Sequence, residues 1–206
     1  LPFPSDHFTT ADDDSPTGRR VALPTGQLAN TSGVTLDPTQ WNRNDGFSPG
    51  TPVLLSAPGV DLDQSGLPRQ GDIGASMSDD SASVVVDLDT GERLAHWVEL
   101  DSTPGPDEPP LLILHGAATF PQGHRIAVAF RHLLDASGTE LEPSVAFRAY
   151  RDRLTTDLDE IEDRRPDMEK VFDGLADVGG DRGDLHAAWS FTVVSPENLA
   201  GRLLAM

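Results

Sequence analysis

Residues 124–130 read His-Arg-Ile-Ala-Val-Ala-Phe, and this stretch decides the fold class. Ile126, Val128 and Phe130 alternate with smaller or polar residues, and a period of two predicts a half-buried β-strand. Four more apolar runs of strand length, each bounded by turn residues, occupy 52–57, 83–88, 94–100 and 111–115. The sequence therefore predicts a mainly β, α+β protein whose body is an antiparallel sandwich or a related sheet.

The hydrophobic period changes over residues 157–178, where Asp157 and Glu160 can begin a helix. Four apolar residues at i, i+3, i+4 and i+7 would share one face of it: Met168, Val171, Phe172 and Leu175. Pro166 should kink or divide this helix, and two glycines from Gly179 end it. We expect a helical insertion within the sheet body.

Alternating apolar residues after the insertion predict a return strand with one strongly apolar face: Leu185, Ala187, Trp189, Phe191 and Val193. A last helix follows, because Ser195 suits its N-cap and Pro196 its first position. Leu199, Leu203 and Leu204 would form its apolar face. The chain stops at Met206 with no capping glycine after these leucines, so we expect the helix to be interrupted there and more protein to follow.

Composition divides the chain into three parts. Residues 1–52 are rich in Pro, Asp, Thr, Asn and Gly, which predicts an extended, turn-rich arm lying on the body. Residues 53–150 form the predicted β domain. Residues 151–206 hold the helical insertion, the return strand and the start of the C-terminal helix.

The net charge of −19 comes from 34 acidic and 15 basic residues. Nucleic acid and anionic membranes are poor partners for such a surface, because it would repel phosphates. The chain has no cysteine, which excludes disulfides and thiolate catalysis, and no apolar run long enough to span a membrane.

An acidic loop matches the spacing of calcium-binding loops, with oxygen ligands in Asp61, Asp63, Ser65 and Asp72 and a glycine at its sixth position. Pro68 lies inside the loop, and an aspartate replaces the usual bidentate glutamate. An acidic loop without metal is the favoured interpretation, and calcium is the one cofactor that the sequence suggests.

Other residues allow more than one interpretation. Trp41 and Trp97 could form an aromatic contact surface, although packing in a core or interface is commoner for tryptophan. Residues 87–92, with Asp and Gly between two strands, predict a hairpin turn.

Residues 111–116 resemble the strand and His-Gly turn that lead to the oxyanion hole of α/β-hydrolases. Those enzymes also need a Gly-x-Ser-x-Gly turn, which this sequence lacks. An enzyme would therefore need an unfamiliar site, built from His115, His124 and carboxylates such as Asp135.

Several short motifs taken together carry a family resemblance: residues 1–9, 41–50, 90–93, 123–129, 134–138 and 189–192. They resemble the N-terminal region of secreted actinobacterial hydrolase-like proteins and, more distantly, the N-terminal domain of bacterial virulence-factor lipases. The resemblance implies a secreted or cell-surface protein in which an immunoglobulin-like region precedes an α/β-hydrolase-like domain. Any catalytic serine would then lie beyond Met206.

We therefore expect a noncatalytic accessory module that binds, shields or positions a downstream hydrolase domain. That domain is the expected partner, alongside other surface proteins or a second copy of the chain. The alternatives are a structural subunit of a cell-surface assembly, whose arm would pair with a neighbour's sheet edge, and the unfamiliar enzyme described above.

Overall fold

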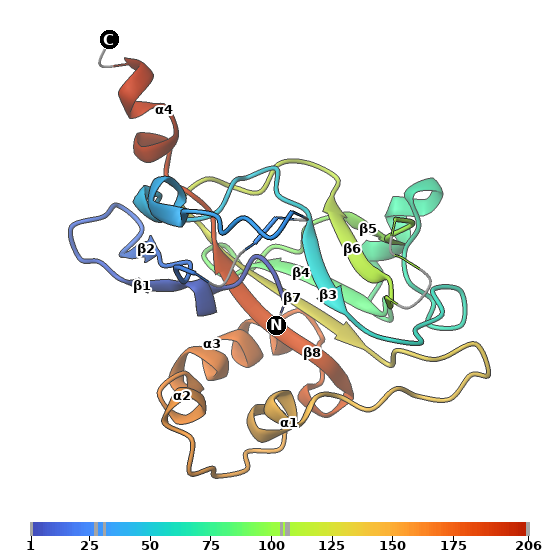
Figure 1. The fold of residues 1–206 in the computed structure, drawn as a ribbon. Coiled ribbons are helices and arrows are strands. Elements are labelled where there is room, and N and C mark those ends of the chain that lie inside the picture. Colours follow the sequence, from blue (N-terminus) through green and yellow to red (C-terminus); the bar gives the residue numbers. More distant parts are fainter. Residues whose placement is uncertain (1, 27–28, 31, 104, 106–107, 205–206) are drawn as a thin grey trace.

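The computed structural model describes residues 2–26, 29–30, 32–103, 105 and 108–204. Within these residues the chain forms three antiparallel sheets with α-helices and short 3-10 helices around them, so the fold is a β-rich α+β fold (Figure 1). None of the described helices is long and apolar enough to cross a membrane.

The sheets contain eight strands: β1 (Thr9–Ala11), β2 (Arg19–Val21), β3 (Val53–Ser56), β4 (Ser83–Asp87), β5 (His96–Leu100), β6 (Leu111–Gly116), β7 (Arg125–Arg131) and β8 (Leu185–Thr192), counted over the described residues. β1 and β2 form a hairpin, and the other strands form two sheets of order β3-β6-β5 and β4-β7-β8. Every strand predicted from an apolar run is present, with ends shifted by a few residues.

The two larger sheets enclose one apolar core. The first sheet contributes Val53, Leu55, Val98, Leu112 and Leu114, and the second contributes Val85, Ile126, Val128, Phe130, Trp189 and Phe191. Packing across this core makes two layers of sheet, as the predicted antiparallel sandwich requires.

Helices form a third layer, on the other face of the β4-β7-β8 sheet (Figure 1). They are α1 (Val145–Arg151), α2 (Asp159–Glu162) and α3 (Arg165–Ala176). Ala127 and Ala129 of β7 are buried under Val171 and Leu175 of α3. The prediction of a half-buried strand at 125–130 was therefore wrong, because the alanines that look like a neutral face are small enough for a helix to cover them.

A register shift near the end of β7 corrects the predicted face of β8. Phe130 pairs with Ala187, whereas Arg131 pairs with Leu185, so His186 is the extra residue of a bulge. Ala187 and Trp189 face the core between the sheets, as predicted. Leu185 instead packs in the core under the helices, because the bulge reverses the alternation before it.

The helical insertion begins later than the sequence predicted. Asp157 is not the N-cap, because α2 begins at Asp159 after Leu158, which makes no capping hydrogen bond. Pro166 divides the segment, since it lies in the first turn of α3, where a proline needs no amide partner. The short helix α1 was not predicted; the hydroxyl of Ser144 caps it by accepting from the amide of Phe147 at 3.2 Å. The predicted boundary at 150/151 falls inside α1.

The N-terminal arm lies on the body, as predicted. Phe3 pairs with Leu54 of β3, and the indole of Trp189 donates to the carbonyl oxygen of Pro4 at 2.8 Å. Asp6, at the start of the 3-10 helix η1 (Asp6–Phe8), accepts from the amide of Thr192 at 2.8 Å. A second 3-10 helix, η2 (Pro38–Arg43), completes the arm, while η3 (Gln70–Met77) and η4 (Arg182–Asp184) lie in later loops.

Candidate functional site

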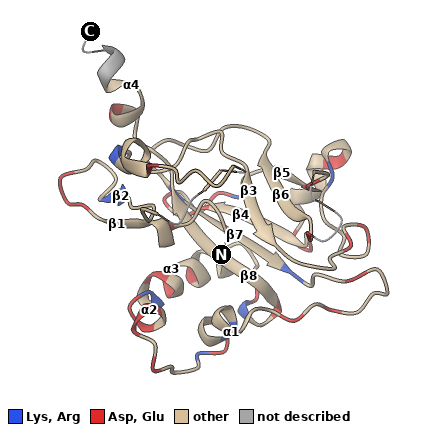
Figure 2. Ribbon diagram, viewed as in Figure 1, with Lys and Arg blue, Asp and Glu red and all other residues tan. Residues whose placement is uncertain are grey.

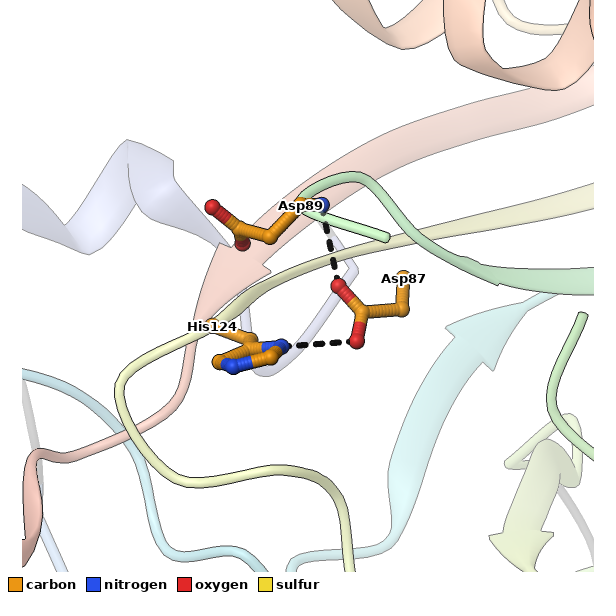
Figure 3. Close-up of side chains that lie close together, drawn as sticks. All are labelled: Asp87, Asp89 and His124. Carbon is orange, nitrogen blue, oxygen red and sulfur yellow. Dashed lines mark hydrogen bonds and ion pairs between the residues drawn. The ribbon is translucent and has the colours of Figure 1, made fainter. Parts of the chain in front are cut away.

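One end of β4 brings three candidate ligands together from two separate stretches of the chain. Asp87 is the last residue of β4 and is only 2% exposed. Its carboxylate accepts from the amide of Asp89 at 2.9 Å and from Nδ1 of His124 at 2.7 Å (Figure 3). His124 directly precedes β7, which is the hydrogen-bonded neighbour of β4.

The turn at 87–92 holds Asp89 in place. The amide of Gly91 donates to the carbonyl of Asp87 at 2.8 Å, and Gly91 has a φ of 74°, which glycine adopts without strain. Asp89 in turn accepts from the amide of Arg125 at 2.7 Å. The predicted hairpin turn is therefore present, because Val86 and Arg93 form an antiparallel bridge across it and the amide of Asp87 donates to the carbonyl of Glu92 at 2.9 Å. The pairing is short, since β5 then enters a different sheet from β4.

The hydrogen bond from His124 to Asp87 raises the pKa of His124 above its ordinary 6.5, and the charges of Asp87 and Asp89 add to this effect against a smaller opposing effect of burial. The neighbouring carboxylates therefore favour the protonated form of this imidazole, and the same arrangement of charges would favour another cation in its place.

The ligand atoms of Asp87, Asp89 and His124 all lie within 4.8 Å of one another, and no other trio of histidine or acidic residues in the described part of the chain does so. Carboxylate oxygen and imidazole nitrogen are ligands for divalent metal ions. We call these three residues the Asp-His cluster.

The predicted calcium loop is not gathered around a common point. One oxygen of Asp61 accepts from the amides of Asp63 and Gln64, and the Ser65 hydroxyl bonds to the backbone of Leu134. The carboxylates of Asp61, Asp63 and Asp72 do not all lie within 4.8 Å of one another, although each is described. Calcium at this loop stays a prediction, and its own hydrogen bonds are enough to hold the loop.

Trp41 and Trp97 lie in different parts of the fold. Trp41 is in η2 and is 52% exposed. Trp97 is on β5 and stacks on His115 of β6, with ring centroids 4.9 Å apart. Trp97 and His115 line a shallow pocket to which Trp41 does not contribute. The predicted aromatic surface therefore divides into two separate features.

The residues of the unfamiliar enzyme hypothesis do not converge. His115 is on the β3-β6-β5 sheet and lies 2.9 Å from Glu99, whereas His124 belongs to the Asp-His cluster. Asp135 follows the far end of β7 and accepts from the amides of Ser137 and Thr139 in a tight turn. Three groups in three separate networks give no common position for a substrate.

Sequence reasoning missed a buried histidine at the other end of β4. Nε2 of His96 accepts from the hydroxyl of Ser83 at 2.8 Å, and Nδ1 donates to the carbonyl of Leu94 at 2.8 Å. His96 is fully buried, and this burial lowers its pKa from 6.5 to about 4. No local motif marks the pair, because its members lie 13 residues apart on strands of different sheets.

An arginine network beside the arm was missed for the same reason. The side chain of Arg125 donates to Asp6 of the arm and to Ser190 of β8. Arg125 and Arg19 both lie within 4 Å of Asp167 on α3. These groups line a polar pocket, but each charge already has an opposite charge beside it. The network therefore fastens the arm and α3 to the sheet.

No protein-family model matches the chain, and no curated protein or solved structure matches it either.

Proposed function

We propose that this chain is a noncatalytic accessory module that packs against a neighbouring folded domain. The contact would form through a surface made by Trp41, Arg43 and Leu199, which we call the docking surface. The observation that carries this proposal is the position of the last helix, α4 (Pro196–Leu204), which projects away from the sheets (Figure 1).

The start of α4 is firmly attached to the body. The hydroxyl of Ser195 accepts from the amide of Asn198 at 3.1 Å, which confirms the predicted N-cap. The buried carboxylate of Asp45 accepts from the amide of Ser195 at 3.0 Å. Asn198 also donates to the carbonyl of Arg43 at 3.3 Å, which places the first turn of α4 beside η2. The helix therefore has a fixed origin and direction.

Apolar side chains near this junction are left in solvent. Leu199 of α4 is 53% exposed, and Trp41 of η2 is as exposed. Leu203 and Leu204 were predicted to share an apolar face with Leu199, but their side chains lie outside the described part of the structure. Tryptophan and arginine are the residues most often found at the energetic centre of protein interfaces, and Arg43 is also exposed. These features suit docking to another protein surface.

The charge of the chain argues against a second copy as the main partner. Acidic residues are spread over the helices and loops (Figure 2), and the net charge is −19. Two copies would repel each other at low ionic strength. A neighbouring domain of a different surface charge is the better partner.

We further propose that the two-layer sheet is an immunoglobulin-like sandwich. The resemblance to secreted hydrolase-like proteins supports a hydrolase-like neighbour in a secreted or cell-surface bacterial protein. The cell-surface assembly is less supported, because Phe3 of the arm already pairs with Leu54 of its own chain.

The proposal is tested by the weak self-association that an exposed apolar surface should cause once high salt screens the charges. We expect Leu199→Asp, and deletion of residues 196–206, to reduce the association measured by sedimentation equilibrium. Both changes should alter self-association more than they alter the thermal unfolding midpoint.

Leu158→Asp is the matched control, because Leu158 is equally exposed but lies at the start of α2, away from the docking surface. It should leave association unchanged. A deletion that unfolds the body would show that α4 belongs to this core. Unchanged association of the Leu199→Asp variant would contradict the proposed docking surface.

A further inference from the structure

We propose that the Asp-His cluster binds one divalent transition-metal ion of the Zn²⁺ class, with Asp87, Asp89 and His124 as its protein ligands. This inference is independent of the docking surface, because the cluster lies at the junction of β4 and β7 and shares no residue with that surface.

The spacing of the ligands fits an ion of this size. Zinc bound to nitrogen and oxygen at about 2 Å in a tetrahedron needs ligand atoms about 3.3 Å apart. The ligand atoms of the cluster lie within 4.8 Å of one another, and the hydrogen bond between Asp87 and His124 is 2.7 Å long. Side-chain rotations that shift the ligand atoms by about an ångström would therefore bring all three to zinc-binding distance without moving either strand.

The backbone already orients both carboxylates. One oxygen of Asp87 is held by the amide of Asp89, which leaves the other oxygen directed at His124 (Figure 3). One oxygen of Asp89 is held by the amide of Arg125. Carboxylate ligands of metal ions are commonly fixed by such outer hydrogen bonds, which reduce the entropy lost on binding.

The charge around the cluster favours a cation. Asp87 is buried and Asp89 lies beside it, so two negative charges meet one imidazole. The guanidinium of Arg125, the nearest basic residue in the sequence, is bound to Asp6 and Ser190 and so does not neutralise the cluster. A divalent ion would balance the two carboxylates, while Nδ1 of His124 gives up its proton to solvent.

The mixed ligand set selects the class of ion. Calcium and magnesium prefer six or more oxygen ligands, whereas imidazole suits zinc and its neighbours. The side chain of His124 is 36% exposed, which leaves room for water to complete the coordination. We therefore expect binding of Zn²⁺ and Co²⁺, and much weaker binding of Ca²⁺.

The test is isothermal titration calorimetry of the chelator-treated chain with ZnCl₂, and separately with CaCl₂. We expect one Zn²⁺ per chain, and a loss of affinity of about tenfold or more in Asp89→Asn and in His124→Gln. Titration with Co²⁺ should give visible absorption bands in the wild type, and both variants should lose these bands. An adventitious ion bound elsewhere on the acidic surface would give the same spectrum in the wild type and in the variants.

Two variants at exposed positions of the same residue types serve as controls. Asp63→Asn removes a carboxylate of the predicted calcium loop, and His115→Gln removes an exposed imidazole; both should bind Zn²⁺ as the wild type does. Circular dichroism establishes that each variant is folded. Zn²⁺ affinity unchanged in folded Asp89→Asn and His124→Gln would overturn the proposal, and so would calcium binding that Asp63→Asn abolishes while Zn²⁺ does not bind.

Discussion

The two ends of β4 carry the same kind of contact in opposite surroundings. At its start, Ser83 bonds to the imidazole of His96, and at its end Asp87 bonds to the imidazole of His124. His96 has no exposed surface, whereas about a third of the His124 side chain is exposed.

This difference in burial shifts the pKa values of the two histidines in opposite directions. Burial lowers the pKa of His96 to about 4, while the hydrogen bond to Asp87 raises the pKa of His124. A neutral, dry imidazole can only act as a fixed link between the two sheets. An imidazole at the surface beside a carboxylate can exchange its proton for another cation. Burial and the neighbouring group, and not the residue type, thus separate a structural histidine from a candidate ligand.

The largest effect should follow removal of the buried imidazole. His96→Ala leaves a cavity and takes the partner from the buried Ser83 hydroxyl, so we expect a loss of about 3 kcal/mol in the free energy of unfolding. Urea denaturation measures it. His124→Ala is the matched control and should cost less, because the His124 side chain is partly exposed and the Asp87 carboxylate keeps its hydrogen bond from the amide of Asp89. Equal losses would contradict the contrast between the two ends of β4.

The second prediction concerns acid. Because the folded-state pKa of His96 lies below 6.5, the unfolded chain binds a proton between pH 6.5 and about 4 that the folded chain does not. Stability from this group is present above pH 6.5 and is lost as the pH falls, by about 2 kcal/mol between pH 7 and pH 5.

Comparison with a variant isolates this effect from the many titrating carboxylates. The difference in unfolding free energy between wild type and His96→Gln should shrink by about that amount from pH 7 to pH 5. A difference that stays constant with pH would show that His96 is not held neutral.

The sequence predicted the parts of this arrangement that depend on local periodicity. β7 was recognisable from residues 125–130, and all four apolar residues predicted to share a face of the helical insertion are buried. Such patterns report which side of an element is apolar, and they do so within ten or so residues.

Features that depend on the partner of each strand were not predictable. Nothing near Ala127 or Ala129 shows that α3 will cover them, and the bulge at His186 has no local signal. The Asp-His cluster joins residues 37 positions apart, so the sequence identified only its turn at 87–92. Strand pairing and sheet crossing create such sites, and one sequence does not reveal either.

A smaller effect is expected at the exposed end of β4. Since the pKa of His124 is raised, its pairing with Asp87 stabilises the fold fully below pH 6.5, and this contribution is lost as the pH rises through the raised value. Exposure limits it to less than about 1 kcal/mol. In metal-free buffer, NMR titration of the His124 ring should give a pKa above 6.5 that falls in Asp87→Asn. An unchanged value would mean that Asp87 does not hold the proton.

The smallest effect should appear at a third histidine, His115, which pairs with Glu99 on the outer face of the other sheet. Both side chains of this pair are accessible to water, so its attraction is screened, and His115→Ala should change the unfolding free energy by less than about 0.5 kcal/mol.

His115 is also the histidine whose His-Gly sequence resembles a hydrolase turn. Its partners are an indole and a carboxylate, and neither carries a hydroxyl or thiol that the imidazole could deprotonate for acyl transfer. We therefore expect the purified chain to hydrolyse p-nitrophenyl acetate no faster than buffer containing free imidazole does, and the variant to behave identically. Turnover that survives repeated purification and disappears in His115→Ala would show that an exposed histidine pair can be catalytic here, and the division between structural and exchangeable histidines would then need a third class.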